Sequence, residues 1–154
     1  MKRVILTLTL AAAPLIVQAA EFDVEIHNPT RGLYYTPLLV TAHPPNMKLF
    51  EAGEAASSEL QAMAEGGDIM PLVTALDSAG ATTVANPAAG LLAPGETTTA
   101  IVNTNNATAN TQLSIVAMLL PTNDGFLALN SLTVPTQPGT YTYNLNAYDA
   151  GTEA

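Results

Sequence analysis

The chain has 154 residues, of which 13 are acidic and only four are lysine or arginine, so its formal net charge is −9 at pH 7, and it contains no cysteine. The missing cysteines exclude disulfides, thiol catalysis and Cys-ligated zinc, and the lack of a basic patch argues against nucleic acid and anionic lipid as partners. Cations are the natural counterparts of so acidic a chain.

Residues 1–19 have the layout of a secretory signal peptide. Lys2 and Arg3 form a positive n-region, VILTLTLAAAPLIV is an apolar h-region, and VQA supplies small residues before a cut after Ala19. The apolar run is too short for a spanning helix, which argues against the alternative of a retained membrane anchor. Cleavage would leave residues 20–154 as one secreted or periplasmic domain with no membrane span and a net charge of −11, because two of the four basic residues leave with the signal.

The first part of this domain predicts two strands. In FDVEIHN, the apolar residues Phe22, Val24 and Ile26 alternate with polar ones, which is the period of a half-buried strand. After a turn at NPTRG, the sequence YYTPLLVTAH predicts a second strand over residues 34–43. Pro37 inside this range indicates a sheet edge or a bulge.

Two short helices are predicted next. Over residues 55–66, Ser58 and Gln61 make a capping-box pattern, and apolar residues recur at helical spacing until a Gly-Gly pair. A second helix is predicted to begin at Asp68 as its N-cap, with Pro71 in its first turn.

The rest of the chain returns to strand-forming composition. Residues 97–103, 111–120 and 141–148 are rich in Thr, Val, Ile and Tyr and are separated by Gly, Asn and Pro clusters. Strands spaced in this way around one helical insert predict an all-β fold. We expect an antiparallel β-sandwich with one or two short helices inserted between early strands.

Nucleophilic and zinc catalysis find little support in the sequence. There are two histidines, too few for a three-histidine zinc site, and no serine lies in a G-x-S-x-G elbow. His27 falls on the polar face of the first strand, which favours a solvated side chain, and the place of His43 at a strand end favours a structural hydrogen bond. A paired-carboxylate glycosidase stays open on charge, but the chain has no tryptophan for sugar stacking.

Two oxygen-rich loops follow apolar strands. One places Asp124 before Gly125, and the other places Asp149 and Glu153 around Gly151. Loops at strand ends of a sandwich can meet at one pole, and calcium prefers carboxylate, carbonyl and water oxygens in flexible loops. From the residues alone, a calcium site and ordinary solvated turn residues both stay open.

A family resemblance covers the chain from about residue 22 to residue 154, and three blocks carry it: TPLLVTAHPPNMKLFEAGEAASSELQAMAEGGD, LSIVAMLLPTNDGFLALN and YDAGTEA. In this order they resemble the spondin N-terminal domain family, the module of F-spondin and mindin that also occurs in short bacterial secreted proteins. The resemblance implies a C2-like antiparallel β-sandwich with one calcium ion at one end. Its ligand positions fall on Asp124, Asp149 and Glu153.

Two positions depart from the family pattern: Gly125 stands where the family has a tryptophan, and Glu153 stands where it has an aspartate. The resemblance implies an exported, non-enzymatic, calcium-binding domain in extracellular or cell-envelope binding or adhesion, with a protein or glycan ligand. A calcium-dependent hydrolase that uses the same carboxylate-lined pole is the alternative from a different class. A purely structural module without a working metal site is a third.

Overall fold

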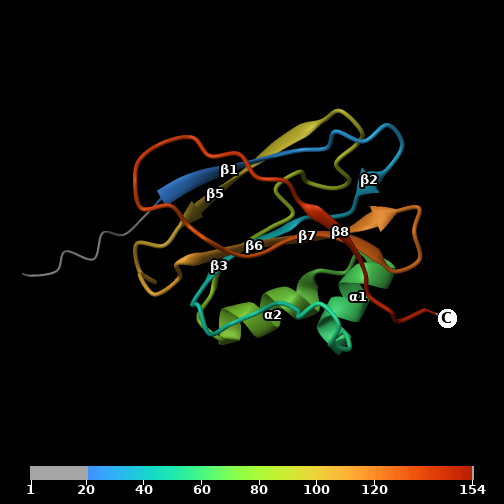
Figure 1. The fold of residues 1–154 in the computed structure, drawn as a ribbon, viewed down its shortest axis with the longest axis horizontal. Helices are drawn as coiled ribbons and strands as arrows, with labels where there is room; N and C mark the ends of the chain where they lie inside the picture. The colour runs from blue at the N-terminus through green and yellow to red at the C-terminus, as the bar shows by residue number, and fades with distance from the viewer. Residues whose placement is uncertain (1–20, 154) are drawn as a thin grey trace, which may run out of the picture.

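The structure, a computed structural model, describes residues 21–153. Its elements in chain order are β1 (Glu21–His27), β2 (Tyr34–Tyr35), β3 (Leu39–His43), α1 (Ser58–Gly66), α2 (Met70–Ser78), β4 (Thr82–Ala85), β5 (Thr97–Asn103), β6 (Gln112–Leu120), β7 (Gly125–Thr133) and β8 (Asn146–Asp149). The strands form a two-stranded sheet, β1-β5, and a six-stranded sheet in the order β4-β3-β6-β7-β8, with β2 also paired to β6. The helices cover the face of the larger sheet that is turned away from β1 and β5 (Figure 1). The predicted all-β sandwich with inserted helices is confirmed.

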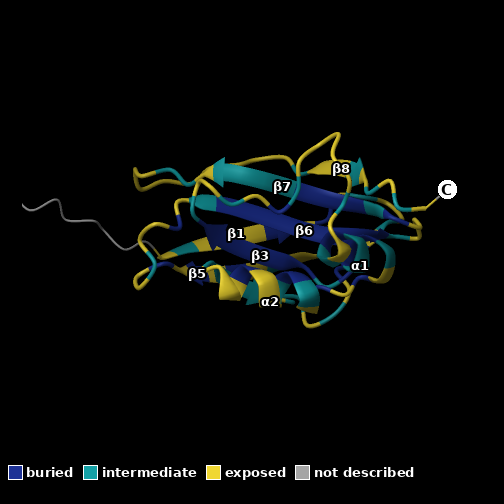
Figure 2. Ribbon diagram, turned by 90° about the horizontal axis from the view of Figure 1, so that it is seen from below, coloured by how far each residue is buried: buried dark blue, intermediate teal, exposed yellow. Residues whose placement is uncertain are grey.

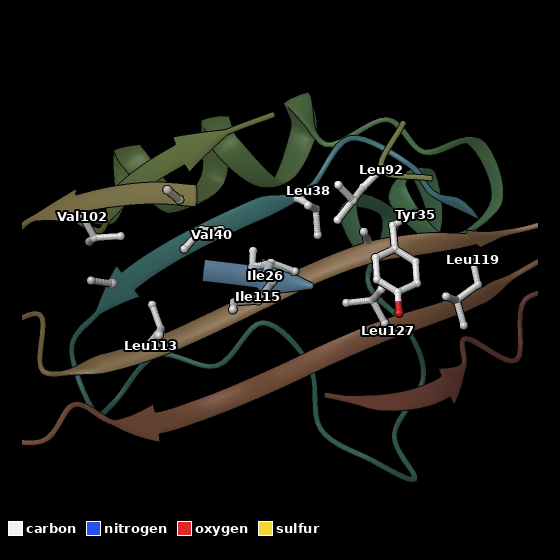
Figure 3. Packing of buried hydrophobic residues seen from close by; sticks show 13 residues of the cluster. Ile26, Tyr35, Leu38, Val40, Leu92, Val102, Leu113, Ile115, Leu119 and Leu127 are labelled. Atoms are coloured by element: carbon white, nitrogen blue, oxygen red, sulfur yellow. The ribbon is translucent and has the colours of Figure 1, made fainter. Parts of the chain in front are cut away.

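Two hydrophobic cores lie on opposite faces of the larger sheet, and β6 contributes to both. Leu113, Ile115 and Ala117 face β1 and β5, whereas Val116 and Met118 face the helices. Because both faces of β6 are buried, its sequence is a continuous apolar run rather than an alternating one. Figure 2 shows β6 and the neighbouring β3 buried along most of their length, and Figure 3 shows the core between the sheets.

The prediction for the first strand is confirmed. In β1, Ile26 is buried, and Phe22 and Val24 are partly buried against the core between the sheets. The polar residues between them are exposed. Strand β5 coincides with the predicted range 97–103.

The strand predicted over residues 34–43 is interrupted. Strands β2 and β3 are separate, and both pair with β6. Pro37 lies in the gap between them, where its missing N–H costs the sheet no ladder hydrogen bond. The pairing with β6 shifts by one residue across this gap, from Tyr35↔Leu119 in β2 to Leu39↔Val116 in β3, so the chain has one extra residue here, as in a bulge. The predicted bulge at Pro37 is confirmed, whereas the alternative of an edge is wrong for β3, which lies inside the sheet between β4 and β6.

Both predicted helices form, but their caps differ from the prediction. The N-cap of α1 is Ser57 rather than Ser58, and Ser57 Oγ accepts the N–H of Leu60 at 3.2 Å. Helix α2 begins at Met70, and its N-cap is Ile69 rather than Asp68. Asp68, one residue before the N-cap, accepts the N–H of Met70 through Oδ1 at 3.0 Å. Among the described residues, no helix has the length and apolar character needed to cross a membrane.

The sequence patterns missed β4 and β7 and overextended β8. Strand β7 follows directly on the Asp124 loop, and its first half is buried on both faces, so no alternation marks it. The strand predicted over residues 141–148 is reduced to β8, which pairs with only the first four residues of β7. Residues 140–145 keep a strand-like alternation but are not in a strand.

His43 makes the structural hydrogen bonds predicted for it. Its Nδ1 lies 3.0 Å from the carbonyl oxygen of Pro44, so Nδ1 carries a proton, and the Nε2 of a neutral ring then accepts from the Ser114 hydroxyl at 2.8 Å. Ser114 Oγ also accepts the N–H of Ser131 at 2.8 Å, where the β6–β7 register shifts and Ser131 has a φ of 54°. The buried imidazole thus supports this irregularity in the sheet.

Gly67, which ends α1, gives a test of the packing between α1 and the β2–β3 connection. Its φ is 67°, and a Cβ at this position would lie 3.0 Å from the Cβ of Thr36. Thr36 has little freedom to move, because its Oγ1 accepts the N–H of Met118 at 3.0 Å. We expect Gly67→Ala to lower the free energy of unfolding by about 1–3 kcal/mol in urea denaturation, through backbone strain and this contact.

Gly80→Ala is the matched control. Gly80 follows α2 with a φ of 84°, and nothing lies within 4 Å of its Cβ position. An alanine at position 80 introduces backbone strain but no close contact. Gly80→Ala should therefore lower the free energy of unfolding less than Gly67→Ala does. Equal losses at the two positions would show that the contact with Thr36 does not matter.

Candidate metal centre

The turn between β6 and β7 places Asp124 at one end of the larger sheet. Asp124 is only 8% exposed. Thr122 closes the turn, since its Oγ1 accepts the N–H of Gly125 at 3.1 Å. A Cβ on Gly125 would lie 2.6 Å from Thr122 Oγ1. With Thr122 in this position the turn has no room for a Cβ at residue 125, which fits the glycine that stands here in place of the tryptophan of the family pattern.

Strand β8 brings Asp149 beside this turn. Asp149 is the register partner of Gly125, and the N–H of Ala150 donates to the carbonyl oxygen of Asp124 at 3.2 Å. Asp149 Oδ1 accepts the N–H of Gly151 at 2.7 Å, and Gly151 has a φ of 68°, a conformation that glycine adopts without strain. The chain turns here and passes back over Asp124.

The Asp124 carboxylate holds the segment that follows. Its Oδ2 accepts the N–H of Thr152 at 3.0 Å and the N–H of Glu153 at 3.3 Å. These hydrogen bonds, led by the one from Thr152, hold the pKa of Asp124 below its ordinary value, although partial burial acts in the opposite direction. At neutral pH the carboxylate is therefore ionised and fixed in place.

The structure brings Asp124 and Asp149 to neighbouring positions, and it brings Glu153 to Asp124 through the backbone. The side chain of Glu153 is exposed, and no contact that fixes it is described. Within residues 21–153, no group of three or more His, Cys, Asp or Glu side chains is spaced to hold a metal ion. The convergence of these three carboxylates on one ion stays a prediction.

Thr152 adds an oxygen that the sequence reasoning missed. Its Oγ1 is buried and has no hydrogen-bond partner among the described residues, and its own N–H places it beside the Asp124 carboxylate. A buried hydroxyl of this kind is costly unless water or an ion supplies a partner. Carboxylate and hydroxyl oxygens are hard donors, so this donor set fits calcium rather than a soft metal. The only signal in the sequence is the position of Thr152 between Gly151 and Glu153.

An aromatic cluster supports the same end of the sheet. The ring of Phe126 lies 5.2 Å from that of Phe50 at 87° and 5.5 Å from that of Tyr148 at 23°. Phe126 follows Gly125 and Tyr148 precedes Asp149, so the cluster fixes both strand ends that carry the acidic loops. The family tryptophan is missing, but aromatic packing beside the site is not.

Comparison with known proteins agrees with this arrangement. A family model described as Spondin_N matches residues 23–154. The match extends from β1 to the C-terminal segment, so it includes both acidic loops. No curated protein matches the chain.

The hydrogen bonds of Asp124 predict a pH-dependent effect of Asp124→Asn. The folded pKa is lowered, so the carboxylate's contribution to stability is complete above the unfolded pKa of about 3.9 and is lost as the pH falls through the folded pKa. Asparagine accepts weaker hydrogen bonds and should lower the free energy of unfolding at neutral pH. The difference from the wild type, measured by urea denaturation in chelator, should shrink on acidification.

Glu54→Gln is the control for this experiment, because Glu54 is an exposed carboxylate in a turn. Its difference from the wild type should be small at neutral pH. A difference for Asp124→Asn that stays constant down to about pH 2 would contradict the role given to the ionised carboxylate.

Proposed function

The chain belongs to the spondin N-terminal family, an extracellular type of domain, and on that premise we propose that it is an exported, non-enzymatic binding or adhesion domain stabilised by one calcium ion. The observation that carries this proposal is the closure of the C-terminal segment onto Asp124. It assembles hard oxygen atoms from two distant loops at one end of the sandwich.

Four residues would hold the ion. Asp124, Asp149 and Glu153 supply carboxylates, and Thr152 supplies the hydroxyl that lacks a partner. Bound calcium would neutralise these carboxylates and tie the β6–β7 turn to the segment after β8. The protein contributes a preformed part of the site, because backbone hydrogen bonds already fix Asp124 and Asp149.

The charge balance supports an external cation at this end. Apart from the predicted signal peptide, the chain has only two lysine or arginine residues, Arg31 and Lys48. Lys48 Nζ lies 3.1 Å from Glu51 Oε2 in a surface ion pair. Asp124, just before β7, and Asp149, at the end of β8, therefore depend on solvent or metal ions to offset their negative charge.

A calcium-dependent hydrolase would need a nucleophile or a base beside the carboxylates. The contact between His43 Nε2 and Ser114 Oγ joins residues with no exposed surface. Substrate has no access to this pair, so it cannot supply the nucleophile and base of such a hydrolase.

Calcium should stabilise the wild type and should do so through Asp149. An ion that binds only the native state adds about 2.7 kcal/mol at a hundredfold excess over its Kd, or about 5–10 °C in Tm for a domain of this size. Asp149→Asn should abolish most of this shift and raise the Tm of the metal-free form, because it removes one of several like charges. Glu153→Gln should reduce the shift less, since its side chain is exposed.

Differential scanning calorimetry in calcium and in chelator measures these shifts, with Glu54→Gln as a variant that should keep the wild-type response. A wild type with the same Tm in both conditions, or an Asp149→Asn variant with an intact shift, would sink the proposed site.

The predicted signal peptide lies outside the described residues, and it has its own test. Amino-terminal sequencing of the protein recovered from the periplasm or the medium should give Ala20 or Glu21 as the first residue. Recovery of intact Lys2 and Arg3 in a membrane fraction would favour a retained anchor instead.

A further inference from the structure

Strand β1 has a hydrogen-bonded neighbour on one edge only. Among residues 21–153 it pairs with β5 and with no other strand. Just beyond β1, the N–H of Asn28 donates to the carbonyl of Glu96 at 2.9 Å, and the carbonyl of Asn28 accepts the N–H of Gly95 at 2.7 Å. Even-numbered residues thus direct their backbone toward β5, and the odd-numbered residues of β1 direct their N–H and C=O groups toward the free edge.

The same odd-numbered residues carry a row of acidic side chains. Glu21, Asp23 and Glu25 are exposed on the outer face of β1, at alternate positions about 7 Å apart. Their register partners on β5 include no basic residue: they are Asn103, Ile101 and Thr99. The free edge therefore combines unpaired backbone groups with negative charge that no neighbouring strand offsets.

The sandwich is also incompletely covered beside this edge. The sheet that contains β1 has two strands, and the larger sheet has six. Figure 3 shows Ile26 of β1 beside Ile115 of β6, and both belong to the core between the sheets. The partly buried apolar side chains packed against the same core include Phe22 and Val24 of β1. Val134 and Leu145, from the connection between β7 and β8, also pack against it. One more strand beside β1 would add cover here.

We propose that the free edge of β1 binds an extended segment of a basic partner protein as an added antiparallel strand. Backbone groups of Asp23, Glu25 and His27 would complete the ladder. Lysine or arginine at alternate positions of the segment would lie opposite the acidic row, and apolar residues between them would face the core. A second copy of this chain fits poorly, because it would set one acidic row against another.

This inference specifies a partner class for the proposed binding function, but its surface is separate from the carboxylate end and needs no calcium. The probe is a blocked peptide of about ten residues that alternates lysine and valine. In chelator and low salt, with the full chain, the peptide should slow hydrogen exchange at the amides of Asp23, Glu25 and His27. The amides of Val24 and Ile26 already donate to β5 and should change little. Unchanged exchange at the three odd-numbered amides under saturating peptide would overturn the proposal.

Two N-methylated peptides test the geometry. In an antiparallel added strand, the residues whose side chains lie on the acidic face also direct their N–H groups toward β1. Methylation of the lysine amides should therefore abolish binding, whereas methylation of the valine amides should preserve it. Equal binding of the two peptides would show that no ladder forms and would overturn the proposal.

Two charge reversals of equal size test the site. Glu25→Lys replaces an attractive cross-strand pair with a repulsive one and should weaken peptide binding about fivefold. Glu54→Lys makes the same change at an exposed turn away from β1 and should leave the affinity within about twofold. Unchanged melting temperatures would show that both variants fold. Equal weakening of peptide binding by the two variants would indicate general attraction to an acidic chain and would overturn the proposal. A dimer in analytical ultracentrifugation, with the odd-numbered amides of β1 protected in the absence of peptide, would also overturn it.

Discussion

Strand β6 is hydrogen-bonded along both edges and packed on both faces, and the rest of the structure is organised around it. On one edge it pairs with β2 and β3, and on the other with β7. Its side chains contribute to the core between the sheets and to the core under the helices. Because β6 leads directly into the β6–β7 turn, this doubly buried strand also fixes the position of Asp124.

At the acidic end of the sandwich, two carboxylates hold the chain in place through backbone hydrogen bonds. Asp124 accepts the N–H groups of Thr152 and Glu153, which gives the segment after β8 a defined shape. Asp149 does the same for Gly151 over a shorter distance. An ion arriving here would meet oxygen atoms that need little further ordering, so less of its binding free energy would be lost to conformational entropy.

Negative charge has different consequences at the two acidic surfaces of the domain. At the carboxylate end, Asp149 lies beside the turn that carries Asp124, and the proposed calcium ion would offset their negative charge. Along β1, the acids are spread along one strand beside unpaired backbone groups, a pattern that suits an extended cationic segment. Within residues 21–153, neither set of acids has an ion-pair partner, and the surface ion pair that does form joins Lys48 to Glu51, which belongs to neither set.

The sequence by itself determined the sandwich class, the alternation of β1, the two inserted helices and the two acidic loops, because residue period and turn chemistry record which side of each segment is buried. It missed β7, whose first half shows no alternation, although the equally buried β6 was predicted from its apolar and β-branched composition. It also extended a predicted strand over residues 141–145, which form none. Only the tertiary structure decided that Asp149 lies beside Asp124, that Thr152 has an unpartnered hydroxyl, and that β1 has a free edge. Each of these depends on which strands pair, and pairing joins residues too far apart in the chain for local pattern to specify.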